Sequence, residues 1–269
     1  MISTHNNPIT IGSLNIHYEN SVKSAPRYTI TLSSQQQHRQ QSISINTLLF
    51  QYFQSNTIGI DQHQDQDQDQ DQDQDQDQDQ DHNSTQVTSY ANSIISLEQM
   101  IQSNESKITI HTVTSFLHSM YSQIQFLLKH KLAISFMEAQ DIMVVDGTHF
   151  FFCNYNKLYN IRNDKTILVT DFYDVHNLTL PPEFITNIVL PFSTYYTSSF
   201  YSLAILILRC LNKICGDGNG LTQCSETTQH EILQYYQSQS QSQYQYTKLY
   251  VTLKHCLIKD PRQRTLHIF

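Results

Sequence analysis

The sequence predicts an α+β protein, with a small β-rich region in residues 1–94 and a larger, mainly helical region in residues 95–269. Short runs of β-forming residues mark the first region, whereas the second contains two long segments with the apolar pattern of helices. A strand–turn–strand pattern lies in the middle of the chain. With 269 residues, 39% of them hydrophobic, the chain can bury a core in one large domain or in two lobes.

Strands are expected to dominate the first region. Residues 9–11 and 14–18 can pair through a Gly-Ser turn, and residues 28–32 alternate between polar and apolar side chains with a period of two. A helix is expected over residues 43–53, where apolar residues recur at helical spacing, and a short strand over residues 86–90. This region is therefore expected to form a small sheet with one helix.

Residues 61–82 are an almost perfect alternation of Asp and Gln. Asp is disfavoured in strands and nothing here can be buried, so we expect an extended, solvated insertion in the small region. A loose tail that binds cations or a partner is the alternative. This run holds ten of the 24 acidic residues, and the other 14 face 16 Lys and Arg. Because the rest of the chain is nearly neutral, no nucleic-acid partner is expected.

Cysteine usage and hydropathy indicate a reduced, cytoplasmic protein. No two cysteines form a C-x-x-C pair and one is left odd, which favours free thiols over a disulfide framework. The N-terminus shows no secretory signal, and the most apolar segment, residues 200–211, is too short to span a bilayer. The 13 histidines are scattered without metal-ligand spacing. We therefore expect neither a membrane partner nor a histidine metal site.

The strand–turn–strand pattern lies at residues 142–153. Residues 142–145 are apolar, residues 149–153 are rich in β-formers, and Asp146-Gly147 between them suits a two-residue hairpin turn.

Helices are expected on both sides of this hairpin. A short helix is expected over residues 94–101 and a long one over residues 107–129, and residues 166–170 read as a strand. Residues 198–211 are apolar on all sides, as in a buried helix. The apolar face of the long helix has steps of three and four and consists of Val113, Phe116, Leu117, Met120, Ile124, Leu127 and Leu128.

The hairpin and its flanks resemble the catalytic-loop and metal-loop segment of eukaryotic-type protein kinases. In that family H-R-D-x-x-x-x-N supplies a base and a metal-binding amide, and D-F-G supplies a second metal ligand. In this sequence the amide position falls on Asp141 and the base position on Phe136, which follows Ile134 and Ser135 in place of His and Arg. The D-F-G falls on residues 154–156, Asn-Tyr-Asn.

Three later stretches resemble the family in the same order. Residues 180–184, Leu-Pro-Pro-Glu-Phe, are similar to the A-P-E segment, and residues 198–211 to the helix at the centre of the large lobe. Residues 253–264 match L-x-x-C-L-x-x-D-P-x-x-R at every fixed position. In the family this arginine pairs with the glutamate of A-P-E, so the resemblance implies a Glu183–Arg264 pair.

The residues that move a phosphoryl group in the family are mostly replaced. Thr31 falls at the phosphate-binding lysine, and Ser199 at the aspartate that braces the catalytic loop. Phe136 cannot accept a proton, and Asn154 is a neutral metal ligand. Glu138 falls where the family usually has a lysine near the transferred phosphate, which reverses the local charge. The chain also lacks a glycine-rich, phosphate-covering loop, because Gly12 and Gly59 are the only glycines before Gly147.

The resemblance therefore implies a bilobal, protein-kinase-like fold in a catalytically impaired member, a pseudokinase, that acts by binding a protein. Thr31, Asp141 and Asn154 are the degenerate cofactor-binding positions, and Asp141 and Asn154 the metal positions, so binding of ATP and Mg²⁺ is expected to be weak or lost. Two alternatives stay open. One is a divergent, ATP-dependent serine/threonine kinase that uses Glu138 or Asp141 as its base. The other is a structural α+β protein with an accidental kinase-like spacing.

Overall fold

The chain is an α+β protein that divides into two compact units, one of residues 1–10 and 14–92 and the other of residues 11–13 and 93–269. Side chains are described from residue 93 onward, except at 212–215 and 244–247. The expected helix at 43–53 and the Asp–Gln run at 61–82 lie outside the described residues. The computed structural model describes residues 9–11, 14–19, 27–32, 86–90, 93–103, 108–174, 177, 179–187, 189–215, 234 and 244–267.

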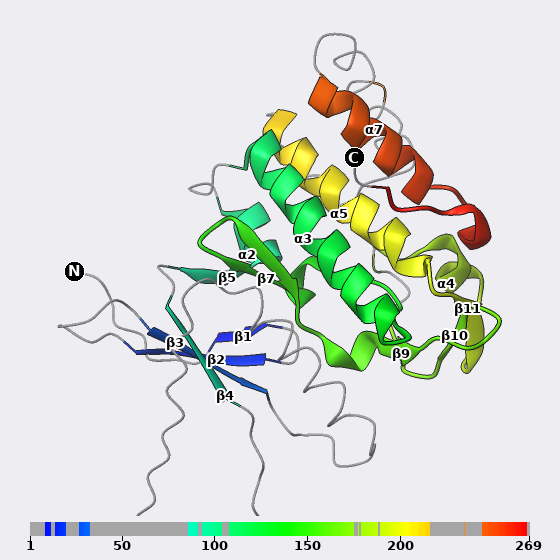
Figure 1. Ribbon diagram of the computed structural model, residues 1–269, viewed down its shortest axis with the longest axis horizontal. Coiled ribbons are helices and arrows are strands. Elements are labelled where there is room, and N and C mark those ends of the chain that lie inside the picture. Colours follow the sequence, from blue (N-terminus) through cyan, green and yellow to red (C-terminus); the bar gives the residue numbers. More distant parts are fainter. Residues whose placement is uncertain are drawn as a thin grey trace, which may run out of the picture. The chain divides into compact units, whose positions relative to one another are not determined.

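The first unit contains a four-stranded sheet with the strands in sequence order (Figure 1). Strand β2 pairs antiparallel with β3, from Leu14 opposite Leu32 to Glu19 opposite Arg27, and β3 pairs antiparallel with β4. All four strands were expected from their β-forming runs. Their bounds are β1 (Ile9–Ile11), β2 (Leu14–Glu19), β3 (Arg27–Leu32) and β4 (Gln86–Tyr90).

The second unit begins with a strand where a helix was expected. Residues of β5 (Ile94–Ser96) pair with the hairpin, and α2 (Leu97–Gln102) follows. The helix starts at 97 because Ser96 caps it: the Ser96 hydroxyl accepts a hydrogen bond from Gln99 N at 3.1 Å, and the Gln99 side chain accepts one from Ser96 N at 2.8 Å. The expectation of a helix from residue 94 was therefore wrong for residues 94–96, which form β5.

The expected hairpin forms from β7 (Ile142–Val145) and β8 (His149–Phe152), which join β5 in a sheet of order β5-β7-β8. Val145 pairs with His149, so the loop has three residues rather than the expected two. Asp146 and Gly147 have φ angles of 50° and 68°, the left-handed region that a Gly adopts without steric cost. The Asp-Gly signal located the turn, but it did not fix the loop length.

Helix α3 (Ile110–Lys129) covers the hairpin and carries the expected apolar face. Its N-cap is Thr109, whose hydroxyl accepts a hydrogen bond from Thr112 N at 3.2 Å. Six of the seven expected face residues are buried, and Leu128 is half-buried. Gln123, on the same face, is also fully buried. Its amide donates to Phe152 O at 2.9 Å and accepts from Phe152 N at 2.8 Å, so it completes the hydrogen bonds of β8.

Short strands complete the second unit. Strand β6 (Leu132–Ile134) pairs antiparallel with β9 (Leu158–Asn160), and β10 (Thr166–Val169) with β11 (Phe192–Tyr195). Of these strands only β10 was expected. Strands β6 and β9 have three residues each, too few to show a period in the sequence.

Helix α5 (Ser198–Cys215) is the buried centre of the second unit. It contacts α3 on one side and α7 (Tyr244–Cys256) on the other, and the three lie in a row in Figure 1. Residues 202–208 are all buried, as expected for a helix packed on every face. Arg209 forms an ion pair with Glu98 of α2, with an N–O distance of 3.0 Å. The short helix α4 (Pro182–Thr186) lies between β10 and β11 in the sequence.

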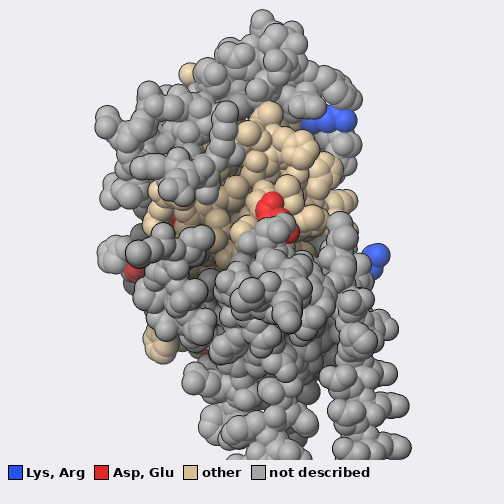
Figure 2. Space-filling model, turned by 90° about the vertical axis from the view of Figure 1, so that its left-hand side faces the viewer, with Lys and Arg blue, Asp and Glu red and all other residues tan. Residues whose placement is uncertain are grey.

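No helix within the described ranges has the length and hydropathy to cross a membrane. On the face shown in Figure 2 the described residues are mainly uncharged, with acidic atoms near the centre and at the left and basic atoms at the right. The cysteines whose side chains the structure describes, Cys153, Cys210 and Cys256, are buried free thiols. Burial raises the pKa of Cys210 and of Cys256 to about 12, so both are protonated at neutral pH.

Substitution of Gln123 tests whether its amide holds β8. Gln123→Met keeps the side-chain length but leaves the N–H and the carbonyl of Phe152 without their buried partner. We expect the free energy of unfolding to fall by at least about 2 kcal/mol in chemical denaturation. Gln125→Met, on the half-buried side of the same helix, is the matched control. Equal stability of the two variants would contradict the assigned role.

Candidate functional site

Two loops of the second unit meet at the residues that the kinase resemblance singles out. The loop between β6 and β7 carries Phe136, Glu138 and Asp141, and the loop between β8 and β9 carries Asn154 and Lys157. Backbone hydrogen bonds join the loops at both ends: Ser135 N donates to Lys157 O at 2.9 Å, and Cys153 N donates to Asp141 O at 2.8 Å. The structure thus brings together four of the expected site residues, Phe136, Glu138, Asp141 and Asn154.

Asp141 is a buried carboxylate with three protein donors. Its side chain is 2% exposed. One oxygen accepts from the Asn154 amide at 2.8 Å, and the other accepts from Glu138 N at 3.2 Å and from Lys157 Nζ at 2.5 Å. These contacts satisfy both carboxylate oxygens within the protein, and the ammonium group balances their charge.

Lys157 links both acidic side chains of the site. Its Nζ contacts Glu138 Oε2 as well as Asp141, and the Asn177 amide donates to the other oxygen of Glu138. The same Nζ lies 4.2 Å from the centroid of the Phe136 ring, in a cation–π arrangement. Lys157 was not expected from the sequence. The charge reversal at Glu138 could have indicated such a residue, because it places two carboxylates, Glu138 and Asp141, close together in the sequence and a nearby cation would stabilise them.

Phe136, at the base position, is a core residue. It is 5% exposed and belongs to an apolar cluster with Ala133, Ile167 and Leu180, among others. Its ring centroid lies 5.4 Å from that of Phe184 and 6.1 Å from that of Tyr173, both in edge-to-face geometry. This position therefore contributes packing, and it offers no atom that can accept a proton.

The metal that the resemblance implies does not fit this arrangement. Mg²⁺ takes oxygen ligands, whereas the Asn154 amide nitrogen and the Lys157 ammonium face Asp141. The Asn154 oxygen accepts from Asn156 N at 3.2 Å. Among the described residues, no group of three or more His, Cys, Asp or Glu could hold a metal ion.

Thr31, the remaining candidate, belongs to the first unit. It lies on β3, where its partners in the register are Asn15 on β2 and Gln86 on β4. Its position places it in a regular sheet.

Helix α5 braces the β6–β7 loop through a residue that the sequence did not single out. Ser202 Oγ accepts from Met137 N at 2.9 Å and donates to Ser199 O at 3.0 Å. Ser199, at the family's bracing position, lies one turn earlier on the same helix. Serines also stand at 198 and 199 of this helix, so nothing in the pattern distinguished Ser202.

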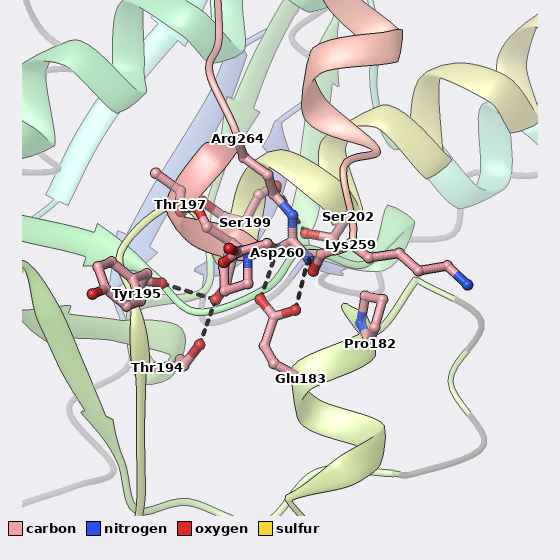
Figure 3. A network of polar contacts seen from close by, with 12 residues as sticks. Pro182, Glu183, Thr194, Tyr195, Thr197, Ser199, Ser202, Lys259, Asp260 and Arg264 are labelled. Atoms are coloured by element: carbon pink, nitrogen blue, oxygen red, sulfur yellow. Dashed lines mark hydrogen bonds and ion pairs between the residues drawn. The ribbon is translucent and has the colours of Figure 1, made fainter.

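Glu183 of α4 and Arg264 form the bidentate pair that the resemblance implies (Figure 3). The N–O distances are 2.6 and 2.8 Å, and the Arg264 side chain is fully buried. Arg264 also donates to the carbonyls of Ile258 and Lys259 at 2.6 and 2.9 Å. Its guanidinium lies 5.1 Å from the Tyr201 ring centroid. With these partners the buried charge is matched, and four of the five guanidinium N–H donors are used.

The nearby titratable groups with shifted pKa values are held neutral. Burial raises the pKa of the Cys153 thiol far above its ordinary value. Burial, and then the hydrogen bond to Asp171 at 2.7 Å, raise the pKa of Tyr159, and burial raises that of Tyr173. None of these three groups is a thiolate or phenolate at neutral pH, so none supplies a nucleophile or a base.

No protein-family model matches this sequence, and no curated protein matches it.

Loss of one partner of the Glu183–Arg264 pair is expected to be costly. Arg264→Met leaves the Glu183 carboxylate without its buried counter-charge, so the free energy of unfolding should fall by about 3–5 kcal/mol. Denaturant unfolding of the purified variant measures this.

Arg262→Met makes the same chemical change at an exposed position nearby, where the side chain is 65% exposed. It should leave the unfolding midpoint nearly unchanged. A similar loss in both variants would show that the buried pair has no special weight.

Proposed function

We propose that this chain is a protein-kinase-like protein without phosphoryl-transfer activity, a pseudokinase, which acts by binding another protein. The observation that carries the proposal is the set of side chains in the β6–β7 and β8–β9 loops. A packed aromatic ring stands at the base position, and a lysine of the protein forms ion pairs with both carboxylates beside it. Phosphoryl transfer depends on a proton acceptor and on cations placed at the phosphates, and these loops offer neither.

The order of the elements supports the kinase likeness against an accidental spacing. A long helix, the hairpin, the A-P-E-like helix α4, the buried helix α5 and the final D-P-x-x-R segment follow one another in the second unit. The Glu183–Arg264 pair joins two of these landmarks across 81 residues. A chance match of motifs gives no reason for this pair to be buried and bidentate.

The contacts of Glu138 and Asp141 weigh against an active kinase that uses either as its base. Each carboxylate contacts Lys157 Nζ. A general base needs a free lone pair within hydrogen-bond reach of the substrate hydroxyl. Here Lys157 and an amide donor contact the oxygens of each carboxylate, and a substrate hydroxyl would have to compete with them.

Exposed apolar side chains near α4 support a protein-binding role. Phe172 is 97% exposed and Val189 76% exposed, and Ile185 on α4 is also exposed. Exposed apolar groups mark protein contact sites where they form a contiguous patch.

A thermal-shift titration with ATP and MgCl₂ tests the proposal. We expect no stabilisation by millimolar nucleotide beyond that of MgCl₂ alone, and no autophosphorylation. A rise of several degrees, with autophosphorylation that Asp141→Ala abolishes, would overturn the proposal. Asp164→Ala, which removes an exposed carboxylate before β10, is the matched control.

Introducing a carboxylate at the base position should damage the fold and restore no activity. Phe136→Asp removes a ring from the aromatic cluster and buries a charge, so we expect a loss of at least about 3 kcal/mol in the free energy of unfolding. Phe172→Asp, at an exposed position, should change it by less than about 0.5 kcal/mol. A stable Phe136→Asp variant with new kinase activity would refute this expectation.

A further inference from the structure

We propose that Lys157 is a built-in cation that takes the place of a divalent metal ion at the carboxylates of Glu138 and Asp141. As long as its charge is present, the two carboxylates hold no metal. Without it, they become a divalent-cation site. This inference rests on the geometry of the two loops and not on the proposed function.

The two carboxylates converge on one point. A single atom, Lys157 Nζ, contacts Glu138 Oε2 and Asp141 Oδ2, so both oxygens face the same small volume. A divalent ion with carboxylate ligands has the same requirement, since its oxygen ligands lie about 2.0–2.6 Å from the ion. The lysine thus occupies the position that an ion would take between these oxygens.

The surroundings hold Lys157 in this position. Its side chain is only 13% exposed, and its ammonium lies over the Phe136 ring. Backbone bonds fix the loop on both sides of it, because Lys157 N donates to Asn154 O at 3.2 Å and Lys157 O accepts from Ser135 N at 2.9 Å. A cation tethered in this way does not exchange with solvent, unlike a bound ion.

Removal of this charge leaves two like charges close together. Asp141 is almost fully buried, and Asn154 and Asn177 contribute only neutral amide donors. Repulsion between partly buried carboxylates is strong and can be relieved by a proton or by a cation. A divalent ion balances both charges at once.

Counting bound Mn²⁺ tests the inference. Free Mn²⁺ is measured by electron paramagnetic resonance during titration of the full chain and of Lys157→Met, a neutral residue of similar length. We expect Lys157→Met to bind one Mn²⁺ ion per chain more than the wild type, and Lys157→Met with Asp141→Asn to lose it. The ten aspartates of residues 61–81 are common to all these proteins, so only the differences count.

Two controls make the outcome decisive. Lys254→Met removes an exposed lysine from α7 and should bind the same number of ions as the wild type. Glu138→Gln in the presence of Lys157 should also match the wild type, because the inference leaves no ion there to lose. One ion fewer in Glu138→Gln, or a folded Lys157→Met that gains none, would overturn the inference.

The folding of Lys157→Met and of the wild type is measured by circular dichroism with and without Mn²⁺. If Lys157→Met folds only with Mn²⁺, the metal has replaced the lysine and the inference is supported. If it folds in neither condition, the Glu138→Gln comparison decides. None of these measurements involves nucleotide. The metal inference can therefore be refuted while the proposed function stands, and the proposed function can be refuted while the metal inference stands.

Discussion

The ion pairs of Lys157 with Glu138 and Asp141 are the interaction on which the centre of the second unit depends. They hold two carboxylates side by side at low exposure, where either would be costly alone. They also connect three segments, because Glu138 and Asp141 lie before β7, Lys157 lies before β9, and Asn177 reaches Glu138 from beyond β10. Ion pairing and loop connection therefore come from the same few atoms.

The aromatic cluster under this network has a complementary role. Phe136 packs against Tyr173 and Phe184, and Tyr173 O–H donates to the carbonyls of Phe184 and Asn187 at 2.9 Å each. The face of the same Phe136 ring meets the Lys157 ammonium. One side chain thus belongs both to the core and to the polar site, and its loss would weaken the two together.

The long elements were predictable because their patterns are local. Helices α3 and α5 show their periodicity over many residues, and the Asp-Gly signal located the hairpin. The first three residues of the expected helix at 94–101 form β5 instead, since pairing with β7 depends on residues about 50 positions away. The resemblance placed Glu183 opposite Arg264, which no local pattern could do.

The contacts that the sequence did not reveal are side-chain contacts across loops. Lys157, Ser202 and Gln123 are ordinary residues in their own segments, and each acquires its role from a partner elsewhere in the chain. Spacing along the sequence carries no information about which side chain will reach a distant backbone amide or carboxylate. The candidate positions could therefore be named, but the lysine that determines their chemistry could not.

The shared position of Phe136 also constrains how this protein can change over time. A carboxylate there displaces a ring that supports Tyr173 and Phe184, and a metal beside it requires that Lys157 first be lost. Substitutions at these four positions are coupled, so their effects should be non-additive. Replacement of one of these residues alone is then disfavoured by its cost in stability, and changes at the site are expected to be concerted.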